Sequence, residues 1–347
     1  MTETMKAAIF EGPGKMAVRE VPKARIEADG DAVVRVVRAC VCGSDLWYFR
    51  GLSPHAANSQ IGHESIGVIE EVGSAVGSVK PGDFVVLPFP YSCGECPVCR
   101  AGFESVCPHG GYFGASQAEY VRVPEADGTV VRVPGSPGDY DDATLASLLT
   151  IADVMSTGYY AAVSAEVKPG STAVVMGDGA VGLCGVISAR MLGARRIIAM
   201  SRHDDRAALA REFGATDIVS ERDQAAIDKV LDMTGGYGAD AVLECVGSKQ
   251  SFDTALGLIR RGGVIGRVGL PHDVEISAEG TFYGNIGIKG GPAPVRHYDI
   301  DSGLLDAVLN HDIDPGRVFT AEYDLDHIQD AYEAMDRRKV IKALIRF

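Results

Sequence analysis

The sequence has no excess of basic residues and no long apolar run. Its 33 Lys and Arg against 47 Asp and Glu give a formal net charge of -14. This balance argues against nucleic acid or an anionic membrane surface as a partner, because both attract clustered Lys and Arg. No stretch approaches the roughly 18 consecutive apolar residues that are typical of a membrane span. We therefore expect neither nucleic acid nor a membrane among the partners.

A secretory signal is also missing from the N-terminal stretch, MTETMKAAIF, which shows no basic region, apolar segment or cleavage site. The expected compartment is therefore the reducing cytoplasm, where disulfides are rare. Internal repeats, low-complexity tracts and heptads are absent as well. We therefore expect an ordinary globular fold, and we expect clustered cysteines to serve as metal ligands rather than as disulfides.

The chain has 347 residues, of which 46% are hydrophobic and 23% are charged, an ordinary balance for a globular protein of two domains. The first 150 residues contain short β-branched runs separated by Gly- and Pro-containing turns, which predicts a mostly β region. Helical periodicity begins near residue 140, and strands then alternate with helices, which is typical of a parallel sheet. The pattern changes again near residue 295 and closes with a short strand, KALIRF.

Three glycines, Gly177, Gly179 and Gly182, form a G-x-G-x-x-G motif in the segment GDGAVG. Alone the motif is weak, because glycines often only mark a turn in an ordinary βαβ crossover. Here it follows an apolar strand, TAVVM, and opens a helix, as a dinucleotide-binding fingerprint requires. The start of such a helix offers free N–H groups and a positive dipole end to a pyrophosphate. The motif therefore predicts a dinucleotide site.

The next strand, RRIIAM, is expected to end at the ribose of the dinucleotide. An NAD site usually carries Asp or Glu there, about 20 residues after the glycines. Ser201 occupies that place, and the basic residues that follow it are Arg202, His203 and Arg206. Basic side chains suit the 2′-phosphate of NADP, so NADP is favoured over NAD. The alternative is that these charges are solvated and that one of the two aspartates between them holds the ribose of NAD.

Four cysteines lie close together with the spacing C-x₂-C-x₂-C-x₇-C, and they are Cys93, Cys96, Cys99 and Cys107. Four thiolates in one loop satisfy a tetrahedral zinc ion. An iron–sulfur cluster is the alternative, whereas disulfides are disfavoured in a cytoplasmic chain. A zinc ion with all four positions filled has no open site, so this zinc would be structural.

A second, sparser set of possible ligands comprises Cys42 in CGSD, His63 in GHE and Asp153 in IADVM. One thiolate, one imidazole and one carboxylate leave a fourth position for water or substrate, the open geometry of a catalytic zinc. Spacing alone does not find this site, because a buried Cys is usually inert and a lone His is usually structural. Asp153 could equally cap the helix that follows it.

Taken together, these motifs resemble the zinc-dependent alcohol dehydrogenases of the medium-chain dehydrogenase/reductase family. The resemblance implies an α/β fold in which a GroES-like β-barrel catalytic domain is interrupted by a Rossmann doubly wound parallel sheet. We expect the catalytic domain at residues 1–153, with a structural-zinc lobe at about 90–110. The Rossmann domain is expected at 154–293, and a return to the catalytic domain at 294–347. The segments that carry the resemblance, in the family's order, are CGSD, GHE, VGSAVGSVKPGDFV, CGECPVCRAGFESVC, AEYVRVP, TGYYAA and GDGAVG.

The resemblance further implies hydride transfer between an alcohol, or its ketone or aldehyde, and a nicotinamide cofactor. Two zinc ions per chain and a homodimer or homotetramer belong to this expectation. A polyol or sugar dehydrogenase of the same family is the alternative. A non-catalytic NADPH-binding relative is a further one, but such relatives commonly lack the catalytic ligands that are present here.

Roles for individual residues follow from the same resemblance. Cys42, His63 and Asp153 would hold the catalytic zinc, and the four clustered cysteines would hold the structural zinc. The other active-site residues expected are Glu64 beside the metal, Asp45 as the partner that orients His63, Ser44 as the group that takes the substrate proton, and Thr157 at the nicotinamide. The cofactor-binding residues expected are Gly177, Gly179, Ala180, Val181, Gly182, Ser201, Arg202, His203, Arg206, Val246, Val268 and, at the pyrophosphate, Lys342.

Two positions depart from the family pattern. Trp47 stands where many members carry the His that ends the proton relay, so the proton must leave through the ribose and water or through a loop residue such as His55. Gly43 stands where some members place a phosphate-binding Arg. Trp47, Tyr48 and Tyr112 suggest an aromatic wall, which favours an apolar substrate.

Overall fold

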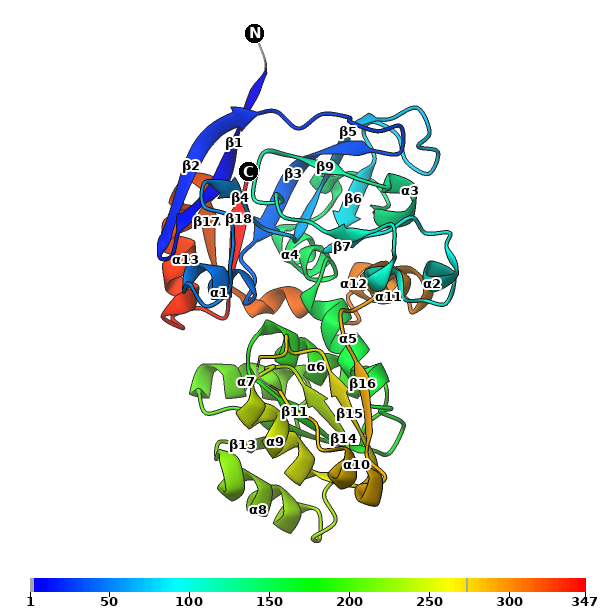
Figure 1. Cartoon of the computed structure of the whole chain (residues 1–347), viewed down its shortest axis with the longest axis vertical. Helices are drawn as coiled ribbons and strands as arrows, with labels where there is room; N and C mark the ends of the chain where they lie inside the picture. Colours follow the sequence, from blue (N-terminus) through cyan, green and yellow to red (C-terminus); the bar gives the residue numbers. More distant parts are fainter. Residues whose placement is uncertain (1–2, 273) are drawn as a thin grey trace. The chain divides into compact units, whose positions relative to one another are not determined.

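The computed structural model describes residues 3–272 and 274–347, which form two compact units (Figure 1). Unit 1 consists of Met1–Asp153 and Pro294–Phe347, and unit 2 consists of Val154–Ala293. These bounds coincide with the expected ones. None of the helices in the described residues combines the length and the apolar character needed to cross a membrane.

Among the described residues unit 1 contains three β-sheets, and within the first 150 residues strands outnumber helices, as expected. Its largest sheet has the strand order β10-β6-β5-β3-β18-β17, with β9 also paired to β3. A three-stranded sheet has the order β2-β1-β4, and β7 pairs with β8. The strands are β1 (Thr4–Gly12), β2 (Lys15–Pro22), β3 (Ala32–Cys40), β4 (Ser59–Gln60), β5 (Ser65–Val72), β6 (Phe84–Leu87), β7 (Pro90–Tyr91), β8 (Gly111–Tyr112), β9 (Tyr120–Val123), β10 (Val131–Val133), β17 (Phe319–Asp324) and β18 (Lys342–Arg346).

The segment that follows unit 2 completes the largest sheet of unit 1. β18 lies between β3 and β17, antiparallel to β3 and parallel to β17. In β3 the β-branched Val34 and Val36 are buried while Arg35 between them is exposed, the alternation of a strand with one face on the core. The helices and 3₁₀ turns are α1 (Asp45–Phe49), α2 (Pro97–Arg100), η1 (Glu104–Val106), α3 (Ala126–Thr129), η2 (Pro137–Asp139), α4 (Asp142–Thr150), α11 (Val295–Asp301), α12 (Leu304–Leu309), η3 (Pro315–Val318), η4 (Leu325–His327) and α13 (Ile328–Asp336).

Unit 2 is a six-stranded parallel sheet with the order β13-β12-β11-β14-β15-β16. The strand order reverses between β11 and β14, and ligands of such sheets bind outside the carboxyl ends of the strands at this point. The strands are β11 (Thr172–Met176), β12 (Arg196–Met200), β13 (Asp217–Val219), β14 (Ala239–Glu244), β15 (Ile259–Arg267) and β16 (Gly287–Gly290). The helices are α5 (Val154–Ser164), α6 (Ala180–Met191), α7 (Asp204–Phe213), α8 (Asp223–Met233), α9 (Lys249–Leu258) and α10 (Ala278–Gly284).

The apolar run near residues 141–163, which shows one helical periodicity in the sequence, is two helices. α4 begins at its N-cap Asp141, whose side chain accepts the backbone N–H of Thr144 at 2.8 Å. A turn over 151–153 then separates α4 from α5. The backbone N–H of Phe89 donates to the carbonyl of Ala152 at 2.9 Å, which fixes this turn. Asp153 therefore lies in a constrained turn rather than within a continuous helix.

Candidate active site and metal centres

The four clustered cysteines converge on one point within unit 1. The Sγ atoms of Cys93 and Cys107 are 3.6 Å apart, and those of Cys96 and Cys99 are 3.5 Å apart. The pairs Cys93–Cys99 and Cys96–Cys107 lie at 4.0 and 3.9 Å. A tetrahedral zinc with Zn–S bonds of about 2.3 Å requires sulfurs about 3.8 Å apart. The arrangement fits a closed zinc site and is too open for disulfide bonds.

The backbone of this lobe stabilises a thiolate. Cys96 is the N-cap of α2, and its Sγ accepts the backbone N–H of Cys99 at 3.5 Å. This hydrogen bond lowers the pKa of Cys96 to about 7, whereas burial raises the pKa of Cys99 to about 12. Zinc binds the thiolate form of cysteine, so one of the four ligands is close to its binding state at neutral pH.

A second group of potential ligand atoms also lies in unit 1. One atom each from Cys42, His63, Glu64 and Asp153 lies within 4.8 Å of the other three. The Oδ2 of Asp153 is 3.7 Å from Cys42 Sγ and 3.5 Å from His63 Nε2. These separations suit neighbouring ligands of a tetrahedral zinc. The structure thus brings together the three ligands expected from the resemblance, with Glu64 beside them.

Asp45 lies on the far side of the His63 ring. Its Oδ1 is 3.4 Å from His63 Nδ1, and its Oδ2 accepts the backbone N–H of Cys42 at 3.0 Å. Gln117, which the sequence did not suggest, donates to the carbonyl of Cys40 at 2.9 Å and contacts Asp45 Oδ2 at 3.4 Å. A carboxylate at Nδ1 keeps the proton there and turns the Nε2 lone pair towards the other ligand atoms.

Glu64 has a cationic partner that the sequence did not suggest. Its Oε1 accepts from Lys342 Nζ at 2.7 Å, and Lys342 also donates to the carbonyl of Val41 at 3.1 Å. Both side chains are buried, and Glu64 Oε2 has no hydrogen-bond partner among the residues that the structure describes. Lys342 was expected at the pyrophosphate of the cofactor; the contact that the structure shows is with Glu64, whose buried carboxylate requires a compensating charge. The pyrophosphate contact stays a prediction.

The electrostatics of this group indicate a shortage of positive charge. Burial raises the pKa of Cys42, and the neighbouring Glu64 raises it further. Burial also raises the pKa of Glu64, although Lys342 opposes the shift. Burial lowers the pKa of His63, but Asp45 and Cys42 outweigh it and the net pKa is well above the usual value. A divalent cation would supply the missing charge, so the donor set and the orphaned Glu64 oxygen fit a metal ion.

Aromatic rings extend from His63 along one side of unit 1. The ring of Phe89 lies 6.3 Å from that of His63, and the ring of Tyr112 stacks on Phe89 at 5.8 Å. Tyr48 packs against His55 at 4.7 Å instead. Part of the expected aromatic wall therefore connects to the candidate metal ligands, with Phe89 as a member that the sequence analysis missed.

Two candidate catalytic residues are Ser44, at the start of α1, and Thr157, within α5. Ser44 is the half-buried residue before α1, and its hydroxyl makes no capping hydrogen bond to that helix. Its side chain is thus not engaged in closing the helix start. Thr157 is buried in α5 of unit 2, and its expected contact with the nicotinamide stays a prediction.

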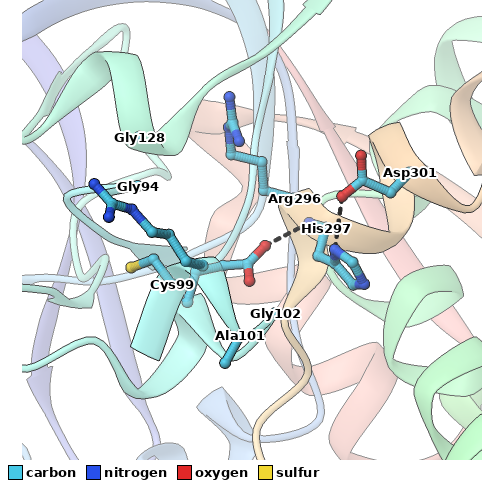
Figure 2. Close-up of a pocket in the computed structure, with 10 residues that line it drawn as sticks. Gly94, Cys99, Ala101, Gly102, Gly128, Arg296, His297 and Asp301 are labelled. Carbon is cyan, nitrogen blue, oxygen red and sulfur yellow. Dashed lines mark hydrogen bonds and ion pairs between the residues drawn. The ribbon is translucent and has the colours of Figure 1, made fainter. Parts of the chain in front are cut away.

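A pocket of about 340 Å³ lies beside the four-cysteine lobe (Figure 2). There Glu104 accepts the backbone N–H of His297 at 2.5 Å, and His297 Nδ1 lies 2.7 Å from Asp301 Oδ2. The first contact joins the lobe to α11, and the second lies within α11. None of Cys42, His63, Glu64 and Asp153 is among the described residues that line this pocket. The lining residues are Gly94, Cys99, Arg100, Ala101, Gly102, Glu104, Gly128, Arg296, His297 and Asp301.

In unit 2 the G-x-G-x-x-G motif follows β11 at the point where the strand order reverses: Gly177 and Gly179 lie between β11 and α6, and Gly182 lies in the first turn of α6. Gly177 has φ +101°, a backbone conformation that favours glycine. A Cβ on Gly182 would come within 1.9 Å of the carbonyl oxygen of Gly177, so no side chain fits there. Gly179 is the N-cap of α6, and Ala180 and Val181 form its first turn. The turn has the geometry that a pyrophosphate site requires.

The ribose-side residues are arranged differently from the expectation. Ser201 is buried, and its Oγ donates to Asp178 Oδ2 at 2.8 Å. Arg206 is also buried, with Nη1 at 3.3 Å from the Asp178 carbonyl and 3.4 Å from its Oδ1. Asp178, inside the glycine motif, was not a candidate in the sequence analysis. Of the three basic residues expected at a 2′-phosphate, Arg206 is thus paired with Asp178, His203 is half-buried and Arg202 is exposed.

The loops after β14 and β15, which carry Val246 and Val268, are held by Glu244. The Glu244 Oε1 accepts the backbone N–H groups of Val246 at 2.9 Å and Gly247 at 2.8 Å. Its backbone carbonyl accepts the N–H of Val268 at 3.0 Å. The buried carboxylate of Glu244 therefore fixes the loop after β14, and its backbone carbonyl holds the loop after β15, both at the carboxyl edge of the sheet.

Comparisons with known proteins agree with this geometry. Residues 28–135 match the family described as "Alcohol dehydrogenase GroES-like domain", and residues 180–293 match that described as "Zinc-binding dehydrogenase". The chain is 37% identical to zinc-type alcohol dehydrogenase B of Aspergillus flavus over 357 aligned positions, which cover 99% of this chain and 81% of the relative.

Two solved structures are similar to the whole chain. Alcohol dehydrogenase TADH from Thermus sp. ATN1 superposes with a TM-score of 0.88 at 31% identity, over 99% of each chain. A zinc-binding dehydrogenase from Sinorhizobium meliloti, described as putative and as bound to NADP, superposes with a TM-score of 0.81 at 27% identity. That match covers 99% of this chain and 100% of the other. With both family matches, the relative and the fold in agreement, the chain belongs to the zinc-dependent alcohol dehydrogenases of the medium-chain dehydrogenase/reductase family.

Proposed function

We propose that this protein catalyses the reversible oxidation of an alcohol to a ketone or aldehyde at a zinc ion held by Cys42, His63 and Asp153. Family membership supports an oxidoreductase that acts on alcohols with zinc and a nicotinamide cofactor. The observation that carries the site assignment is the convergence of three different donor types, from segments up to 111 residues apart, within 4.8 Å. We assign the four-cysteine lobe to a second, structural zinc.

The roles of the side chains follow from their contacts. A zinc ion at this site would act as a Lewis acid that lowers the pKa of a bound alcohol, and the nicotinamide would accept the hydride. Asp45 fixes the orientation of His63 by holding Nδ1. Lys342 balances the charge of Glu64, which leaves one carboxylate oxygen free beside the ligands. The role of the Ser44 hydroxyl, which would take the substrate proton, rests on the family resemblance. Phe89 and Tyr112 give the approach to His63 an apolar, aromatic wall.

This proposal is tested by a substrate panel together with metal analysis. Primary alcohols, secondary alcohols and polyols are offered with NAD and NADP separately, and zinc is counted per chain. We expect two zinc ions and turnover of apolar alcohols, because the side chains near His63 are aromatic. Turnover restricted to polyols would establish the alternative function. A fully zinc-loaded protein without turnover of any alcohol or carbonyl would refute the proposed one.

For the cofactor we propose NADP in preference to NAD. The support is Arg202, an exposed cation two residues after the end of β12, and Ser201 between them, which carries no charge. The NADP described for the Sinorhizobium structure is consistent with this proposal. Arg206 contributes less than the sequence suggested, because Asp178 already pairs with it.

Replacing Arg202 with Ala is expected to raise the KM for NADP about tenfold or more and to leave the KM for NAD nearly unchanged. A charge-assisted hydrogen bond to a 2′-phosphate contributes roughly 1.5–3 kcal/mol, whereas NAD has only a hydroxyl there. Steady-state kinetics with both cofactors measure the effect. Arg211→Ala, an exposed arginine at the end of α7, is the matched control. A higher kcat/KM with NAD in the unaltered enzyme would overturn the NADP preference.

We also propose that the protein is a homo-oligomer. β16 is the edge strand of the unit 2 sheet, and an edge strand offers backbone groups for pairing with a second chain. On α10, just before this strand, the side chains of Phe282 and Tyr283 are 77% and 74% exposed. Light scattering should give the mass of two or four chains; a monomer at micromolar concentration would contradict this expectation.

A further inference from the structure

The sequence lacks an acid at the end of β12, but the structure places one beside that position from another segment. Asp178, in the glycine motif after β11, has its Oδ2 2.8 Å from the Oγ of Ser201. Ser201 is the residue that stands where an NAD site usually carries its ribose-binding Asp or Glu. The carboxylate therefore lies within one hydrogen bond of the expected place, although it comes from 23 residues earlier in the chain.

The Asp178 carboxylate is held on two sides. Ser201 donates to Oδ2, and Arg206 Nη1 lies 3.4 Å from Oδ1 and 3.3 Å from the backbone carbonyl. The Arg206 side chain is 10% exposed and the Asp178 side chain 15% exposed, so the pair is fixed and yet reachable from the solvent. A carboxylate accepts hydrogen bonds at both oxygens with about four lone pairs, so these partners leave it able to accept more.

We infer that Asp178 accepts the hydrogen bonds of the adenosine ribose hydroxyls and is the residue that limits the preference for NADP over NAD. A ribose with two hydroxyls donates to a carboxylate favourably, whereas a 2′-phosphate carries close to two negative charges and is repelled by it. Arg202 thus favours NADP, whereas Asp178 favours NAD. This inference rests on the proposed function only in that unit 2 binds a nicotinamide dinucleotide.

The test measures binding without chemistry. ADP-ribose and 2′-phospho-ADP-ribose, which lack the nicotinamide, are titrated into the zinc-loaded protein by calorimetry, with Asp178→Asn as the variant. We expect the Kd of 2′-phospho-ADP-ribose to fall by about tenfold or more relative to that of ADP-ribose. The variant loses the negative charge that repels the 2′-phosphate and one of the two carboxylate oxygens that can accept from the ribose. The ratio of kcat/KM for NADP and NAD should move in the same direction.

The two ligands separate specificity from folding. A variant that merely loosens the turn would weaken both ligands by the same factor, and that result would overturn the inference. Asp205→Asn, an exposed acid in the first turn of α7, removes the same charge from the neighbouring segment. If Asp205→Asn shifted the ratio and Asp178→Asn did not, the ribose acid would be Asp205 and the inference would be wrong. Measurable binding of both ligands without turnover of any alcohol would refute the proposed function and leave this inference standing.

Discussion

Replacing Asp153 with Asn is expected to lower kcat by more than about 100-fold and to reduce the zinc content towards one ion per chain. A neutral amide is a poorer ligand for a dication than a carboxylate, and even the loss of a partner outside the ligand set typically costs 10–100-fold. The Asp153 carboxylate is 3.5 Å from His63 Nε2 and 3.7 Å from Cys42 Sγ, the two other expected ligands. Turnover and zinc content are measured on the same preparation.

The competing interpretation is that Asp153 only caps the helix that follows it. The chain contains a reference for that case, because Asp141 is an N-cap of α4 with a hydrogen bond to Thr144. Asp141→Ala should lower the free energy of unfolding by about 1 kcal/mol and leave activity intact. If Asp153→Asn behaved like this reference, with full zinc content and normal turnover, Asp153 would not be a ligand.

Replacing Cys99 with Ser is expected to remove one zinc ion and to lower the free energy of unfolding by several kcal/mol, while the other zinc remains. Zinc-binding free energy at a structural site contributes directly to the stability of the fold. The four sulfurs lie 3.5–4.0 Å apart in the pairs measured, so the loss of one leaves an incomplete tetrahedron. Metal analysis and thermal unfolding are the measurements.

The control for this experiment is Cys184→Ser, because Cys184 is buried in α6 and lies outside both ligand groups. That variant should keep two zinc ions per chain even if its stability falls. Retention of both ions at full occupancy in Cys99→Ser would show that the cysteine lobe is not a zinc cage. A brown preparation with iron instead of zinc would identify an iron–sulfur cluster there.

Features whose residues lie close together in the sequence could be predicted from the sequence, and features that join distant segments could not. The four cysteines lie within one loop, so their spacing alone predicts that their sulfurs can meet. The alternating strands and helices of unit 2, like the glycine turn, depend on short-range patterns in the same way. The group of Cys42, His63 and Asp153 is different, since Cys42 and Asp153 are 111 residues apart. Only the family resemblance connected them, and their metal-binding role stays a prediction.

What the sequence analysis missed are contacts between charges far apart in the chain. Lys342 and Glu64 are separated by 278 residues, and nothing in either segment indicates that β18 carries the lysine to the glutamate. Asp178 looked like a variable position within a glycine motif, and its contact with Ser201 depends on the register of two parallel strands. The break between α4 and α5 was missed because Ile151 and Ala152, the first two residues of the turn, continue the apolar pattern of α4.

The position of β18 has a consequence for the order in which the protein is made. During synthesis the ribosome releases all of unit 2, residues 154–293, before it releases β18, the strand that lies between β3 and β17 in the largest sheet of unit 1. Unit 2, a continuous segment, can therefore fold first, whereas β3 and the candidate ligand Cys42 that follows it have no β18 to pair with until synthesis ends. Until Lys342 is released, the nascent unit 1 would have to bury Glu64 without its cation, so the candidate metal site would form late.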